Sequence, residues 1–152
     1  MYTAYRSNST NEEIITLYEA LELIKKLVVI EKENEIFCSE ISQNTMLPED
    51  IKILTEMSLN HRKHIEILID VYAKFTGTIL PHTISFPNWH LNLSYLEQLE
   101  GALFKKIDLI KHYRRILGAM PDKESHTLIV SILTDKITNS DIYNFLISNQ
   151  KL

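Results

Sequence analysis

Residues that interrupt helices are scarce in this chain, and this scarcity limits the folds available to it. The sequence contains three glycines and four prolines among 152 residues. Sheets and irregular folds need more turn-forming residues than this, so long uninterrupted helices are favoured. The length is that of one ordinary domain, and the apolar content of 45% suffices for a buried core. We therefore expect one all-α domain spanning residues 1–152.

Start and stop signals divide the chain into four helical stretches. Thr10 with Glu13, and Ser94 with Glu97, each form the capping-box pattern that begins a helix. The other boundaries are marked by proline, which suits a first helical turn, or by glycine, which suits a helix end. The predicted helices are residues 10–42, 48–75, 94–118 and 121–148.

The connection between the second and third stretches is unusually long. Residues 77–93 hold half of the prolines and have no helical period. The other two links are short, which indicates antiparallel neighbours, whereas this one can cross a bundle lengthwise. His82, Trp89 and His90 lie in it, where they either line a partner surface or cover the end of the bundle. The pattern predicts a four-helix bundle with one crossover.

Polar residues interrupt the predicted buried stripe of each helix near its midpoint. Steps of three and four residues along the four helices give stripes that are otherwise mainly apolar. Helices of similar length packed side by side place their centres at one level. A buried charge is costly unless it is paired, and a shared layer allows pairing. We expect one buried polar layer formed by Glu31, His61, His64, Lys106, Lys136 and Asn139.

This layer resembles the metal centre of the ferritin-like superfamily, and within it the small rubrerythrin-related di-iron carboxylate proteins. Their first helix carries Glu-x-x-Ala-x-x-x-Tyr, which the stretch EKENEIFC matches at Glu31, with Asn34 and Cys38 in the other two places. Their second helix carries Asp-Glu-x-x-His. The stretch NHRKH keeps the histidine as His64 and has His61 in place of the glutamate.

The second half of the family pattern is altered further. The stretch KIDLIKHY keeps Tyr113, but Lys106 stands at the glutamate position. The stretch DKITN keeps Asp135, but Lys136 replaces the glutamate and Asn139 the histidine. The resemblance covers nearly the whole chain. It implies a ferritin-like four-helix bundle with a long crossover between the second and third helices.

The resemblance does not carry the family chemistry to this chain. Only Glu31 and His64 remain of six family ligands. An ammonium about 5 Å from a divalent ion, at an effective dielectric near 20, repels it by about 6–7 kcal/mol. We expect the two lysines to replace the metals by pairing with Glu31 and Asp135. In the family this aspartate hydrogen-bonds the ligand histidine of the other half, here His64.

Two functions remain open from the sequence. The first is a non-catalytic bundle without a bound cofactor, which has lost activities such as ferroxidase, peroxide reduction or iron storage and has a structural or interaction role. The second is an oxidoreductase-type protein with a single Fe or Zn ion. Its ligands would be Glu31, His61 and His64, a set of donors found in many zinc and iron sites.

Charge and hydropathy exclude several partners. The net charge is −4 and residues of both signs are interspersed. The sequence therefore has no basic stripe of the kind that binds nucleic acid. Apolar runs are too short for a membrane span, and the first residues lack the apolar segment of a signal peptide. We expect a cytoplasmic protein, and a homodimer is compatible with the family resemblance. Substrate, pathway and protein partner are not identified by the sequence.

The remaining candidate residues have ordinary structural interpretations. Cys38 is the single cysteine and is expected to be an inert core thiol. Tyr113 and Tyr143 are expected to pack in the core with hydroxyls bonded to the polar layer. His112 and His126 fall off the buried stripes and are expected to face solvent.

Overall fold

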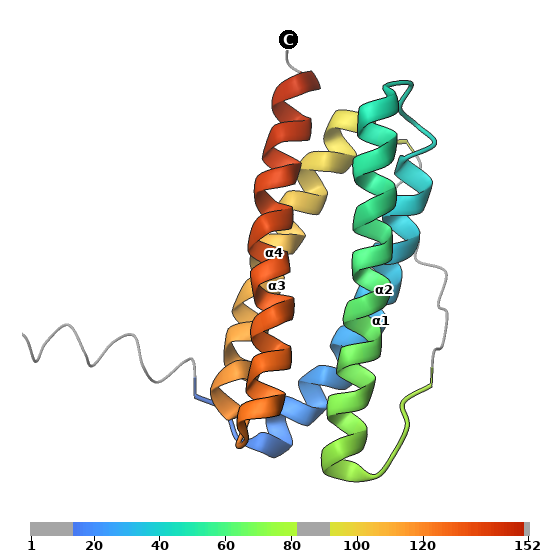
Figure 1. Cartoon of the computed structure of the whole chain (residues 1–152). Helices are drawn as coiled ribbons and strands as arrows, with labels where there is room; N and C mark the ends of the chain where they lie inside the picture. The colour runs from blue at the N-terminus through green and yellow to red at the C-terminus, as the bar shows by residue number, and fades with distance from the viewer. Residues whose placement is uncertain (1–13, 82–91, 151–152) are drawn as a thin grey trace, which may run out of the picture.

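The computed structural model describes residues 14–81 and 92–150, and these form four long helices (Figure 1). No strand occurs in this part of the chain. The expected all-α four-helix bundle is therefore confirmed. The helices are α1 (Leu17–Ile41), α2 (Pro48–Thr76), α3 (Tyr95–Ala119) and α4 (Lys123–Gln150).

The directions of the helices require a connection that crosses the bundle lengthwise. α1 and α2 form one antiparallel pair and α3 and α4 the other, while α1 also packs on α3 and α2 on α4 (Figure 1). The end of α2 and the start of α3 lie at opposite ends of the bundle. The chain between them must therefore traverse its length, as predicted. His82, Trp89 and His90 lie outside the described residues.

The start of α1 differs from the prediction. The capping box expected at Thr10 and Glu13 lies outside the described residues, and α1 begins at Leu17 with Thr16 as its N-cap. The backbone N–H of Glu19 donates to Thr16 Oγ1 at 3.1 Å, and that of Thr16 donates to Glu19 Oε1 at 3.3 Å. The four-residue capping pattern occurs twice, six residues apart, and the second copy caps this helix.

The other helix ends agree with the expected boundaries to within two residues. The capping box of Ser94 and Glu97 is present at the start of α3. Pro48 occupies the first turn of α2. Gly77 ends α2 with a φ of 70°, a left-handed conformation that glycine adopts without steric cost.

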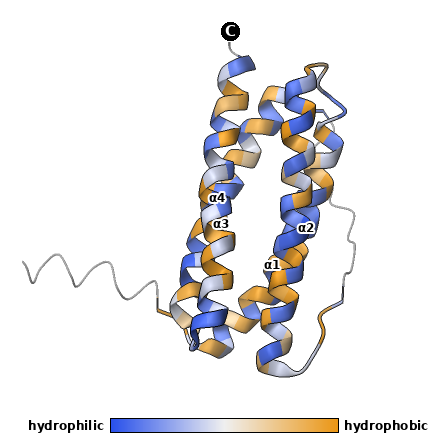
Figure 2. Cartoon of the chain, viewed as in Figure 1, coloured by the Kyte–Doolittle hydropathy of each residue, from blue (hydrophilic) through white to orange (hydrophobic). Residues whose placement is uncertain are grey.

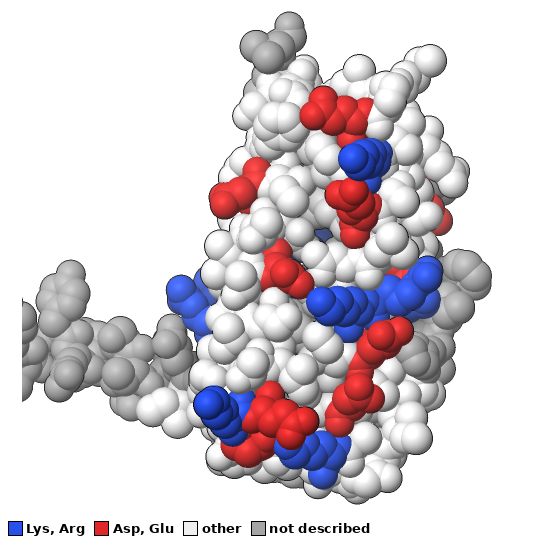
Figure 3. All heavy atoms as spheres, in the orientation of Figure 1, with Lys and Arg blue, Asp and Glu red and all other residues white. Residues whose placement is uncertain are grey.

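The apolar core consists of two clusters. The larger includes Ile24, Leu68, Ile116 and Ile129, and the smaller contains Leu54, Met57, Leu99 and Leu146. Hydrophobic and hydrophilic residues alternate along every helix, as expected for helices with one buried side (Figure 2). Charged side chains of both signs are interspersed on the face shown in Figure 3. No helix of the described chain is both long and apolar enough to cross a membrane.

Candidate functional site

The predicted polar layer is present, and all four helices contribute to it. Its side chains lie between the two apolar clusters at the middle of the bundle. They are 0–2% exposed: Glu31 from α1, His61 and His64 from α2, Lys106 from α3, and Lys136 and Asn139 from α4. Side chains this deeply buried must find partners inside the protein or lose the free energy of their hydration.

Glu31 is the centre of the layer. Its Oε1 lies 2.5 Å from Lys136 Nζ and accepts the hydroxyl hydrogen of Tyr113 at 2.5 Å. Its Oε2 accepts a hydrogen bond from His61 Nδ1 at 2.6 Å. Burial alone would raise the pKa of Glu31, but the Lys136 ammonium and the His61 contact outweigh it and hold that pKa well below its usual value. Glu31 is therefore an ionised carboxylate that links α1 to the other three helices.

His61 connects this ion pair to the second lysine. Because its Nδ1–H donates to Glu31, its Nε2 is free to accept a hydrogen from Lys106 Nζ at 3.2 Å. Burial, together with the charges of Lys106 and Lys136, lowers the pKa of His61 to about 3. Burial and repulsion from Lys136 lower the pKa of Lys106 to about 7. At neutral pH His61 is uncharged, and Lys106 is close to its own titration midpoint.

The expectation that both lysines pair with carboxylates is therefore only half right. Lys136 pairs with Glu31. Lys106 instead contacts the ring of His61, while Lys136, Tyr113 and His61 contact the Glu31 carboxylate. The layer balances its charge with one tight ion pair and one amine whose proton is weakly held.

His64 occupies the other side of the layer. Its Nε2 lies 2.8 Å from Asp135 Oδ2, which is the pairing implied by the family resemblance. Asp135 thus pairs with a histidine and not with a lysine, contrary to our expectation. The other ring nitrogen, Nδ1, is buried without a hydrogen-bond partner among the described residues and lies 3.7 Å from Glu31 Oε2.

Among the described residues, Asn139 is the second member of the layer with an unpartnered buried atom. Its Nδ2 is buried and has no hydrogen-bond partner in the described chain. The residue lies at the inner end of a groove of about 170 Å³ between α2 and α4, which Asn60 and Asp135 also line. The groove gives the amide a path to solvent or to a small polar molecule.

The geometry can be compared with that of a single metal site. One donor atom each from Glu31, His61 and His64 lie within 4.8 Å of one another. Two ligands at about 2.1 Å from one tetrahedral ion are about 3.4 Å apart, so His64 Nδ1 and Glu31 Oε2, at 3.7 Å, nearly fit. His61 Nδ1 does not fit, because its 2.6 Å separation from Glu31 Oε2 is that of a hydrogen bond. These three residues could hold one metal ion only after His61 leaves its hydrogen bond with Glu31.

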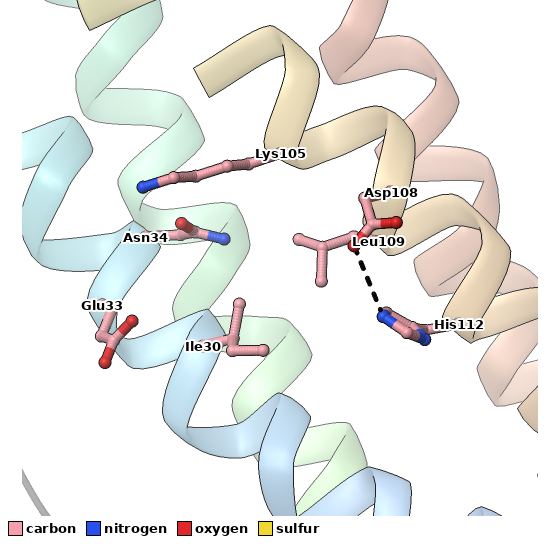
Figure 4. A pocket seen from close by; sticks show the side chains of 7 residues that line it. All are labelled: Ile30, Glu33, Asn34, Lys105, Asp108, Leu109 and His112. Carbon is pink, nitrogen blue, oxygen red and sulfur yellow. Dashed lines mark ion pairs between the residues drawn. The ribbon is translucent and has the colours of Figure 1, made fainter. Parts of the chain in front are cut away.

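A second groove lies between α1 and α3, and Figure 4 shows the side chains that line it. Its volume is about 250 Å³, and its lining includes Asn34 and Lys105. The same two residues line a smaller cavity of about 20 Å³ that reaches Lys106. His112, expected to face solvent, is instead half-buried in the groove, with Nε2 3.6 Å from Asp108 Oδ2. We did not expect this groove, because its lining residues lie at helix edges that the buried-stripe pattern does not include.

Cys38 and the two tyrosines support the layer from the core. Tyr113 bonds the layer directly through Glu31, as expected. The hydroxyl of Tyr143 instead lies 3.4 Å from Cys38 Sγ, and its ring lies 5.8 Å from Lys106 Nζ. Burial raises the pKa of the Cys38 thiol, which agrees with an inert core cysteine.

The shifted pKa of Lys106 makes stability depend on pH. Between its folded pKa of about 7 and its usual value near 10.5, the unfolded state binds more protons than the folded state. The free energy of unfolding should therefore rise with pH over this window. Urea unfolding from about pH 7 to pH 9 should show the rise in the parent, and Lys106→Met should reduce it. Equal slopes in the two proteins would contradict a titrating Lys106.

Fold and layer together define a four-helix bundle with a buried ionic centre. The chain matches no protein-family model and no curated protein. Among solved structures it is similar to a conserved hypothetical protein from Mycobacterium tuberculosis, with a TM-score of 0.70 and 14% identity. The match covers 88% of this chain and 94% of the other. At this identity the similarity establishes the fold alone.

Proposed function

We propose that this protein is a ferritin-like bundle in which an internal ion pair takes the place of the di-iron centre, and that its role is structural or in protein interaction and not catalytic. The observation that carries the proposal is the contact of Lys136 Nζ with Glu31 Oε1 at 2.5 Å, both side chains being fully buried. The ammonium neutralises the one family carboxylate that remains in the layer. Lys136 stands at a position where the family pattern has a metal-binding glutamate.

The rest of the layer supports the same proposal. An ion bound at Glu31 would lie beside the Lys136 ammonium, and the repulsion would cost several kcal/mol. His61 is already engaged through Nδ1 with Glu31 and through Nε2 with Lys106. Binding an ion would require both Lys136 and His61 to leave their present partners.

A second candidate function rests on His64. Asp135 holds Nε2 of this ring and leaves the buried Nδ1 without a partner in the described chain. This is the arrangement in which a carboxylate orients a metal-binding histidine. A single Fe or Zn ion bound to Glu31, His61 and His64 would make the protein a metalloprotein of oxidoreductase type, provided that His61 and Lys136 move.

Elemental analysis separates the two functions. Protein purified without an affinity tag should contain Fe and Zn at well below one ion per chain. His64→Ala serves as the matched control, because it removes the unpartnered Nδ1 and leaves the Glu31–Lys136 pair in place. One ion per chain in the parent, lost in His64→Ala, would refute the metal-free proposal and support the single-metal function.

A further inference from the structure

The outward side of α4 differs from the surfaces of the other helices. All residues from Thr127 to Ser148 are described, and Asp141 is the only charged residue exposed among them. By contrast, α2 exposes charged residues along its length, from Glu49 to Lys74. In Figure 3 the charged side chains follow the α2 side, and the surface over α4 is largely uncharged. Depletion of charge is a mark of protein interfaces.

Large apolar side chains are exposed on the same side of the molecule. On α4, Ile137 is 50% and Phe145 47% exposed, and on α3, Phe104 is 72% and Ile107 46% exposed. Asp135 and Thr138 line the groove toward α2, and Lys105 and Asp108 line the groove toward α1. One residue turns a helix by about 100°, so Ile137 and Ile107 lie on the opposite edges, where α3 and α4 adjoin.

These apolar residues are centred on the middle of the bundle. Lys106 and Lys136 both contact His61, so the two lysines are at one level. Phe104 and Ile137, each within two residues of a lysine, lie close to that level. Ile137 is also near the midpoint of the stretch from Thr127 to Ser148, in which Asp141 is the only exposed charged residue. A surface whose apolar centre lies midway along it can pack on an inverted copy of itself.

The charges of α3 complement each other in the same inverted arrangement. The first turns of α3 carry Glu97 and Glu100, and its last turns carry Lys111, Arg114 and Arg115. Two copies packed antiparallel place the acidic start of one α3 beside the basic end of the other. In a parallel two-fold dimer α3 of each copy would instead face α4 of the other, where Asp141 is the only exposed charge from Thr127 to Ser148, so the charges of α3 would lack opposite partners.

We propose that the face formed by α3 and α4 binds a second copy of this chain, packed antiparallel across a two-fold axis near Phe104 and Ile137. A two-fold interface uses the same surface on both partners, as this face allows. The face is roughly 30 Å long and 20 Å wide, or about 600 Å² per copy, close to the roughly 800 Å² of a standard interface. The proposal does not depend on whether the polar layer holds a metal.

Light scattering coupled to size-exclusion chromatography measures the mass in solution and so tests whether the chain forms a dimer. The parent at about 100 μM should have twice the chain mass of 17.7 kDa. Ile137→Lys places a charge at the centre of both halves and should weaken the dimer by at least about 100-fold. Leu59→Lys on α2, at a site 55% exposed, is the matched control and should remain dimeric. Circular dichroism confirms that both variants are folded.

Chemical cross-linking tests the antiparallel arrangement. In Ile137→Cys the two new thiols lie close to the axis, and a short bifunctional thiol reagent should join the copies. In Phe145→Cys the thiols are about 22 Å apart along the helices and should not be joined. Native Cys38 is fully buried and remains unreactive in both variants. A monomeric parent, a dimer that survives Ile137→Lys, or cross-linking through Phe145→Cys would each overturn the proposal.

Discussion

Lys136→Met is expected to lower the free energy of unfolding by about 3–5 kcal/mol, the usual loss when one partner of a buried ion pair is removed. The substitution keeps the aliphatic bulk of the side chain but leaves the Glu31 carboxylate in the core without a cation. The hydrogen bonds from Tyr113 and His61 remain, so the loss reflects the missing ammonium. Urea unfolding of parent and variant at neutral pH measures it.

Two further variants make this result specific to the ion pair. Glu31→Gln combined with Lys136→Met removes both charges and should recover much of the stability, because no unpaired ion remains. Lys63→Met on the exposed side of α2 should change stability by no more than about 0.5 kcal/mol. If Lys136→Met unfolds like the parent, the ammonium is not paired in the core and the ionic layer is incorrectly described.

Restoring the family ligands should convert the layer into a metal site. The four changes are His61→Glu, Lys106→Glu, Lys136→Glu and Asn139→His. Without metal this variant should be less stable than the parent, because with Glu31 it crowds four buried carboxylates together. With Fe²⁺ at about 1,000 times its Kd, binding should return about 4 kcal/mol and raise the melting temperature by roughly 10 °C.

The restored variant also tests the ferritin-like assignment. Its control adds His64→Ala, which removes the one family histidine that the natural chain retains and should abolish most of the response to Fe²⁺. The parent should respond little. If the restored variant melts at the same temperature with and without Fe²⁺, these six positions do not have the geometry of a di-iron centre, and the family assignment fails.

The polar layer could be predicted because helix periodicity determines which face of a helix is buried, and similar helix lengths place the helix midpoints at one level. Glu31, His61, Lys106 and Lys136 each interrupt an apolar stripe near a helix midpoint. Residues spaced by steps of three and four lie on the same face of a helix, and this spacing does not depend on the conformation of the loops. The bundle and its crossover followed in the same way from the spacing of helix-breaking residues. The fold and the crossover depend on whole helices, so an error of one or two residues in a predicted helix boundary does not change them.

The partners within the layer could not be predicted because they depend on differences of about an ångström. Both lysines are long enough to reach Glu31, yet Lys136 contacts it and Lys106 contacts the ring of His61. The tautomer of His61 depends on which nitrogen faces the carboxylate, and periodicity does not contain that information. The start of α1 was missed for a different reason: the capping pattern occurs twice in succession, and local sequence ranks the two copies equally.

The most direct test of the metal-free layer is the melting temperature of the unmodified protein with and without Fe²⁺ or Zn²⁺. Weak binding gives little stabilisation by linkage, so equimolar or modest excess metal should raise the melting temperature by no more than about 2 °C. Prior treatment with a chelator should leave the melting curve unchanged. A rise of many degrees that saturates at one ion per chain and disappears in His64→Ala would contradict the account, because the ion would then displace the Lys136–Glu31 pair at little cost.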